Sequence, residues 1–186
     1  MPPEREAARQ GPLARPSAGP LFTTLPPASR FILRGRAAAI RAAGASFGCA
    51  LPEQSGRTAV LGGGRAALWL GPDEWLLLAP GAEGASLALA LEEAMGADPH
   101  SLVEVSHRQI ALEVFGPHAA AILNAGCPLD LDPEAFPVGM CSRTVLAKSE
   151  IVLWRTAPET FHVEIARSFA RYVRGFLEEA SREYRD

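Results

Sequence analysis

An internal repeat with a spacing of 81 to 86 positions is the feature that most constrains how this chain can fold. Gly35-Arg-Ala-Ala-Ala-Ile is followed by Gly116-Pro-His-Ala-Ala-Ala-Ile, and Leu68-Trp69 recurs as Leu153-Trp154. Three further pairs keep the same order: Pro52-Glu53 with Pro133-Glu134, Val60-Leu61 with Val145-Leu146, and Leu91-Glu-Glu-Ala94 with Leu177-Glu-Glu-Ala180. Two small insertions explain the whole series, so the sequence predicts two related halves.

Each half has the same predicted order of elements, β-α-β-β-β-α. Alternating and short apolar runs predict strands, at 30–33, 58–62, 66–70 and 74–79 in one half and at 109–115, 142–147, 150–154 and 161–165 in the other. Gly62-Gly-Gly64 predicts a hairpin turn. Helices are expected at 36–43, ended by Gly44, at 84–95, between Pro117 and Gly126, and at the end of the chain, where Ser168 is a predicted cap.

These patterns predict an α+β fold in which residues 28–186 form a single pseudo-twofold domain with halves 28–97 and 98–183. Residues 1–27 contain seven of the 16 prolines and show no helical or strand period. Because proline cannot join helix or sheet hydrogen bonds, we expect this tail to be extended or disordered. The alternative is an arm that becomes ordered on a partner chain.

Composition excludes several classes of protein. With 48% hydrophobic and 21% charged residues over 186 positions, the chain has the composition of a folded globular domain. The net charge of -3 argues against nucleic-acid binding, and no apolar run approaches the roughly 18 residues that span a membrane. An odd number of cysteines, three, does not suit a secreted disulfide framework, so we expect a cytoplasmic protein.

No motif for a metal or a dinucleotide is present. The four histidines, His100, His107, His118 and His162, lack the spacing of a helical metal pair, and there is no Cys-x-x-Cys. Gly62-Gly-Gly-Arg lacks the Lys-Ser/Thr that completes a phosphate loop, and no Gly-x-Gly-x-x-Gly occurs. The sequence therefore predicts no metal-binding and no cofactor-binding residues in this chain.

The remaining candidates for chemistry each have a simpler structural interpretation. Ser106 and His107 are neighbours that would point to opposite faces of a strand, and Cys127 and Cys141 are expected to be buried thiols. Asp130 and Asp132 are a possible acid–base pair, or a turn anchored by Leu129 and Leu131. Trp69, Trp75 and Trp154 are expected to pack in both halves, and one that is exposed would mark a protein interface. Arg143 and Arg155 are possible anion or interface contacts, or solvated strand residues. We predict no catalytic residues.

Three stretches carry a family resemblance. They are Leu70-Gly-Pro-Asp-Glu-Trp-Leu-Leu, Gly126-Cys-Pro-Leu-Asp-Leu-Asp-Pro-Glu-Ala-Phe-Pro-Val-Gly and Arg143-Thr-Val-Leu-Ala-Lys, and they resemble the gamma subunits of heterotetrameric sarcosine oxidase. Val103-Glu-Val-Ser-His resembles, more distantly, the folate-binding module of glycine-cleavage T-proteins, also called aminomethyltransferases. The resemblance covers roughly residues 21–182.

This resemblance implies an accessory, noncatalytic subunit of a complex that oxidatively demethylates sarcosine to glycine and forms hydrogen peroxide and methylene-tetrahydrofolate. It implies FAD, FMN, NAD and tetrahydrofolate in the partner subunits, and contacts mainly with the alpha subunit beside the beta and delta subunits. The alternatives are a free-standing folate-binding or one-carbon transfer protein, in which Glu104 or Asp130 would contact the folate, and a scaffold for another complex.

Overall fold

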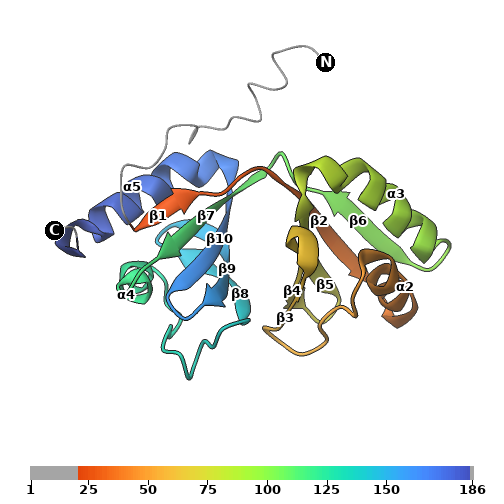
Figure 1. Ribbon diagram of the computed structural model, residues 1–186, viewed down its shortest axis with the longest axis horizontal. Coiled ribbons are helices and arrows are strands. Elements are labelled where there is room, and N and C mark those ends of the chain that lie inside the picture. The colour runs from red at the N-terminus through yellow and green to blue at the C-terminus, as the bar shows by residue number, and fades with distance from the viewer. Residues whose placement is uncertain (1–20, 185–186) are drawn as a thin grey trace, which may run out of the picture. The chain divides into compact units, whose positions relative to one another are not determined.

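The computed structural model describes residues 21–184, which contain two five-stranded sheets (Figure 1). Its contacts separate into two units, described here one at a time. We call Pro27–Ser106 the continuous unit, and residues 21–26 together with 107–184 the terminal unit. Residues 1–20, most of the tail predicted at 1–27, lie outside the described residues.

The continuous unit has one antiparallel sheet in the order β3-β4-β5-β2-β6, with two helices on one face. Ser46 Oγ on one helix donates a hydrogen bond to the Ala90 carbonyl on the other at 3.1 Å. The elements are β2 (Ala28–Gly35), α2 (Ala37–Phe47), β3 (Thr58–Leu61), β4 (Arg65–Gly71), β5 (Glu74–Pro80), α3 (Gly84–Met95) and β6 (His100–Glu104). The predicted glycine hairpin is confirmed, since Gly62–Gly64 join β3 to β4.

The terminal unit has an antiparallel sheet in the order β1-β7-β10-β9-β8. Its elements are β1 (Phe22–Thr24), β7 (Gln109–Phe115), α4 (Ala119–Asn124), β8 (Cys141–Leu146), β9 (Ser149–Ala157), β10 (Thr160–Ala166) and α5 (Ala170–Ala180). Pro117 precedes α4 and Gly126 follows it, as predicted, although the helix itself has only six residues.

Both units follow the predicted order β-α-β-β-β-α, so the α+β class is confirmed, and corresponding strands occupy the same positions in the two sheets. Each sheet has one strand more than predicted. β1 pairs with β7, and β6 pairs with β2. The contacts therefore group residues 98–106 with the continuous unit, beyond the predicted division between halves at 97 and 98. The shared strand order supports the prediction that the chain arose by duplication.

Two predicted helix boundaries are wrong. The first helix does not stop at Gly44 but continues to Phe47, and Gly48 ends it with a positive φ of 108°. Gly44 is needed for another reason, because a Cβ there would lie 2.7 Å from the Cys49 carbonyl oxygen. Ser168 does not cap the last helix, since the N-cap residue of α5 is Phe169 and makes no side-chain cap hydrogen bond.

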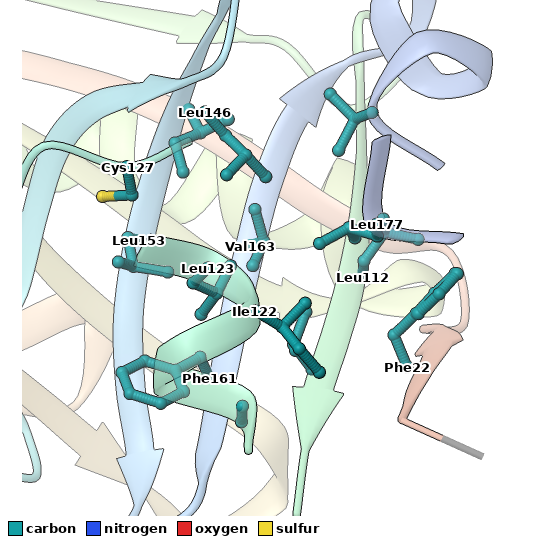
Figure 2. Close-up of a cluster of buried hydrophobic side chains, with 14 of the residues drawn as sticks. Phe22, Leu112, Ile122, Leu123, Cys127, Leu146, Leu153, Phe161, Val163 and Leu177 are labelled. Carbon is teal, nitrogen blue, oxygen red and sulfur yellow. The ribbon is translucent and has the colours of Figure 1, made fainter. Parts of the chain in front are cut away.

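The core of the terminal unit joins every layer of that unit (Figure 2). Alternation places Leu112 and Val114 of β7 on the inner face, as predicted, where they are almost fully buried. Phe22 of β1 is 1% exposed and packs into the same cluster. Both helices and the remaining strands also contribute large members, among them Ile122, Leu123, Leu146, Leu153, Phe161, Val163 and Leu177.

A buried arginine holds the long segment between α4 and β8. Arg155 of β9 is 4% exposed, and its Nη1 donates hydrogen bonds to the carbonyls of Leu131 and Phe136 at 3.2 and 2.9 Å. Its Nε donates to the Pro158 carbonyl at 3.1 Å, and the guanidinium lies 4.9 Å from the centre of the Phe161 ring. Arg155 is therefore a structural residue, and the expectation of a solvated side chain or an anion contact is wrong for it.

Replacing Arg155 by methionine should lower the free energy of unfolding by about 3 kcal/mol, because buried carbonyl oxygens would lose their donors. Urea unfolding monitored by circular dichroism would measure the change. Lys148→Met, at an exposed position in the turn between β8 and β9, is the control and should change stability by less than about 0.5 kcal/mol. Equal stabilities for the two variants would contradict the structural role of Arg155.

Gly44→Ala should destabilise the protein by about 1–3 kcal/mol, although alanine is the better helix former. The added methyl group would meet backbone atoms of Cys49 and Leu51, which cannot move as a side-chain tip can. Gly62→Ala is the control, because among residues 21–184 no atom other than those of its chain neighbours and its own helical turn lies within 4 Å of a Cβ built there. A melting temperature of Gly44→Ala at or above that of the unmodified protein would show that this steric argument is wrong.

Candidate functional site

The continuous unit contains a pocket of about 450 Å³ where α2 begins. Its lining includes the exposed charged residues Arg36, Glu53 and Asp73 above the buried ring of Trp75. The indole N–H of Trp75 is already used, since it donates to the Pro52 carbonyl at 2.7 Å. Because its lining has one positive and two negative side chains, the pocket has no strong preference for a ligand of either charge. No sequence motif indicates this pocket, because its residues come from three separate segments.

The two aspartates proposed as an acid–base pair are turn residues. Asp130 Oδ1 accepts a hydrogen bond from the backbone N–H of Asp132, and Asp132 Oδ1 accepts one from the backbone N–H of Glu134, both at 2.9 Å. Such bonds from a side chain to the backbone two residues later define Asx turns. Leu131 between them is 1% exposed and anchors the segment in the core. These contacts agree with the structural interpretation of Asp130 and Asp132 as turn residues.

Ser106 makes two hydrogen bonds, one through its hydroxyl proton and one through its hydroxyl oxygen. Its hydroxyl donates to the Glu104 carboxylate at 2.8 Å and accepts the backbone N–H of Arg30 at 2.9 Å. The hydroxyl proton of Ser106 is thus directed at the Glu104 carboxylate at the end of β6. The two hydrogen bonds fix the backbone that follows β6. His107 is an exposed residue of the following turn. Glu104, a possible folate contact, is itself engaged by Ser106.

The four histidines lie in four different environments. His100 Nε2 contacts the Glu92 carboxylate at 2.9 Å, and this hydrogen bond, with another to the Asp98 carbonyl, raises the pKa of His100. His118 stacks on Tyr184 with ring centres 4.5 Å apart. His162 contacts Glu164 at 2.7 Å. Within residues 21–184 no three His, Cys, Asp or Glu side chains group closely enough to hold a metal ion.

The cysteines and tryptophans are packing residues. Cys127 and Cys141 are buried free thiols, as predicted, and burial raises the pKa of the partly buried Cys49, which makes its thiolate scarce. Trp69 packs against the core of the continuous unit, and Trp154 lies against His162 with ring centres 5.6 Å apart. Arg143, on β8, is exposed.

Across residues 21–184, the hydroxyl of Ser106 and the carboxylates of Asp130 and Asp132 make hydrogen bonds at a strand end and in a turn, and no metal-binding group of side chains is found. No helix in the same residues combines the length and hydropathy of a bilayer-spanning segment. The features that remain for function are surfaces. One of them is the start of α5, where the rings of Phe169 and Tyr172 are exposed.

Comparison with known proteins identifies relatives over most of the chain. Residues 34–183 match the model of the sarcosine oxidase gamma subunit family. The sarcosine oxidase gamma subunit of Corynebacterium sp. strain P-1 is 39% identical over 139 residues, which is 75% of this chain and 68% of the relative. The same subunit from Corynebacterium sp. strain U-96 is 36% identical over 140 residues, which is 75% of this chain and 67% of the relative.

Solved structures agree with these sequence matches. A chain of the heterotetrameric sarcosine oxidase from Corynebacterium sp. U-96 superposes with a TM-score of 0.83 at 31% identity, covering 99% of this chain and 95% of that one. The glycine-cleavage aminomethyltransferase T of Bartonella henselae superposes with a TM-score of 0.65 at 14% identity, over 84% of this chain and 44% of that one, which shows a shared fold. This chain therefore belongs to the sarcosine oxidase gamma subunit family.

Proposed function

We propose that this chain is the small accessory subunit of a sarcosine oxidase, which demethylates sarcosine to glycine and forms hydrogen peroxide and methylene-tetrahydrofolate. The observation that carries the proposal is the likeness to one chain of a heterotetrameric sarcosine oxidase, which extends over 99% of this chain and 95% of the other. Because the match covers almost all of both chains, little of either lies outside the shared structure where a separate activity could reside. A shared fold alone would not support a shared function.

The chain's part in this enzyme is structural rather than chemical. The polar residues that could have taken part in catalysis instead fix turns and strand ends, as Asp130, Asp132 and Ser106 do. FAD, FMN, NAD and tetrahydrofolate would then be bound by the partner subunits. We propose the alpha subunit as the main contact, in an assembly with the beta and delta subunits. Three free thiols agree with a location in the reducing cytoplasm.

Co-expression with the three other subunits should yield a complex in which this chain is present in equal amount with them. The isolated chain should show no flavin absorbance and no turnover of sarcosine. Size-exclusion chromatography with absorbance spectroscopy measures both. Folded chains that fail to co-purify under these conditions would refute the accessory role.

Within the assembled enzyme, Asp130→Asn should leave turnover of sarcosine within about twofold of the unmodified complex, because an asparagine oxygen accepts the same turn hydrogen bond. A loss of more than about a hundredfold, the scale of a missing acid or base, would assign Asp130 to catalysis.

Calorimetry of the isolated chain with tetrahydrofolate tests the alternative function. Binding of tetrahydrofolate in the micromolar range would favour a free-standing folate-binding protein. The absence of a measurable heat of binding would favour the accessory subunit.

A further inference from the structure

The imidazole of His100 connects the end of α3 to the start of β6. Its Nε2 lies 2.9 Å from the carboxylate of Glu92, in the last turn of α3. Its Nδ1 lies 2.6 Å from the carbonyl oxygen of Asp98, in the turn between the two elements. A carbonyl oxygen and an ionised carboxylate can only accept hydrogen bonds. Both ring nitrogens must therefore donate, and a histidine with two N–H groups is the positively charged imidazolium.

The charges around this ring favour the same protonation state. The last turn of α3 contains Glu92 and Glu93 and no basic residue, and Asp98 follows in the turn. The C-terminal end of a helix dipole is also negative, so a cation beside it is stabilising. The hydrogen bonds to Glu92 and to the Asp98 carbonyl raise the pKa of His100, and the partial burial of the ring only reduces this effect.

The neighbouring elements carry basic residues as well. On β2, Gly35 pairs with His100, and Arg34 and Arg36 on either side of it are exposed. Arg34 forms ion pairs with carboxylates at the start of β5, and the one charged residue of α2, Arg41, is exposed. Exposed charges are screened by water and salt, whereas the carboxylate 2.9 Å away touches the ring directly. The acidic groups therefore determine the charge state of the ring.

β6 buries little of its own surface. It is an edge strand that pairs with β2 and lies beside α3 (Figure 1). His100 and Leu102 are partly buried, and the other three residues of the strand are exposed. The side chain of His100 is 11% exposed, so it makes a large part of the contact between this strand and its surroundings. Loss of its hydrogen bonds would loosen the start of β6 from α3.

We propose that His100, Glu92 and Asp98 form a pH-sensitive latch, which fastens β6 to α3 while the imidazole is protonated and releases the start of the strand when the ring loses its proton. A neutral ring has a single N–H, so it can donate to only one of the two acceptors. The latch lies within the continuous unit and does not depend on the proposed function.

The direction of the pH effect follows from the raised pKa of His100. A group whose pKa is higher in the folded chain contributes stability that is fully present below its unfolded pKa, about 6.5 for histidine. That contribution is lost as the pH rises through the folded pKa. The latch is therefore closed in mildly acidic solution and opens toward alkaline pH.

Glu92→Gln tests the latch in the full chain, and Glu93→Gln is the matched control. Both remove one negative charge from the last turn of α3, and Glu92 is the residue that contacts His100. In an NMR titration, the ring of His100 should titrate at a higher pH in the folded chain than in the chain unfolded by urea. Glu92→Gln should lower this midpoint, and Glu93→Gln should change it much less.

Amide hydrogen exchange tests whether the ring holds the strand. Between pH 6 and pH 9, the protection factors of the β6 amides that bond to β2 should fall about three- to fivefold, the size expected for losing a cation at a helix C-terminus. In Glu92→Gln and in His100→Gln this fall should be largely absent, because the latch is already open at pH 6. Amides that join β2 to β5 are the internal control and should keep their protection.

Three results would overturn the proposal. The first is a titration midpoint of His100 at or below that of the unfolded chain. The second is an equal shift in the two glutamate variants, because the ring would then respond to overall charge rather than to its contact with Glu92. The third is constant protection of β6 from pH 6 to pH 9 while the ring titrates as expected, because the contact would then not hold the strand.

Discussion

The terminal unit depends on the pairing of β7 with two strands at once. β7 meets β10 along its whole length on one side and β1 on the other, where Phe22 lies opposite Val114. β1 has only three residues, yet it places the ring of Phe22 in the core, and fully burying such a side chain is worth about 1.5–3 kcal/mol. The continuous unit has the same arrangement, with β2 between β5 and β6. In each sheet the corresponding strand, β7 or β2, therefore joins the short edge strand to the other three strands.

Inside this framework, most polar groups with the potential for chemistry are committed to structure. Arg155 satisfies carbonyls of the segment that precedes β8, and Ser106 with Glu104 fixes the chain that leaves β6. If one of these groups bound a substrate instead, the segment that it holds would lose its hydrogen bonds. The outer sides of the helices remain, where Tyr172 and Gly175 of α5 take the places of Ser86 and Leu89 of α3. Polar groups that are used within the fold, together with exposed helix surfaces, suit a protein that binds other proteins.

Local patterns in the sequence were sufficient for most of the fold. The alternation at 109–115 and the glycines at 62–64 predicted β7 and the β3–β4 hairpin, because strand faces and tight turns depend on neighbouring residues. β1 and β6 were missed, since each is short and becomes a strand only through a partner distant in sequence. Gly44 was misread as a helix stop because the Cys49 carbonyl that excludes a Cβ is visible only in three dimensions.

The position of β1 has a consequence for synthesis on the ribosome. β1 leaves the ribosome before any other described element, but its partner β7 is made only after the whole continuous unit. The continuous unit is an uninterrupted segment and has all five strands of its sheet once Ser106 has emerged. Until β7 follows, the first strand carries an exposed phenylalanine and unpaired backbone groups on a nascent chain. Folding of the terminal unit is thus tied to the synthesis of residues 107–184, when both of its separated parts are present.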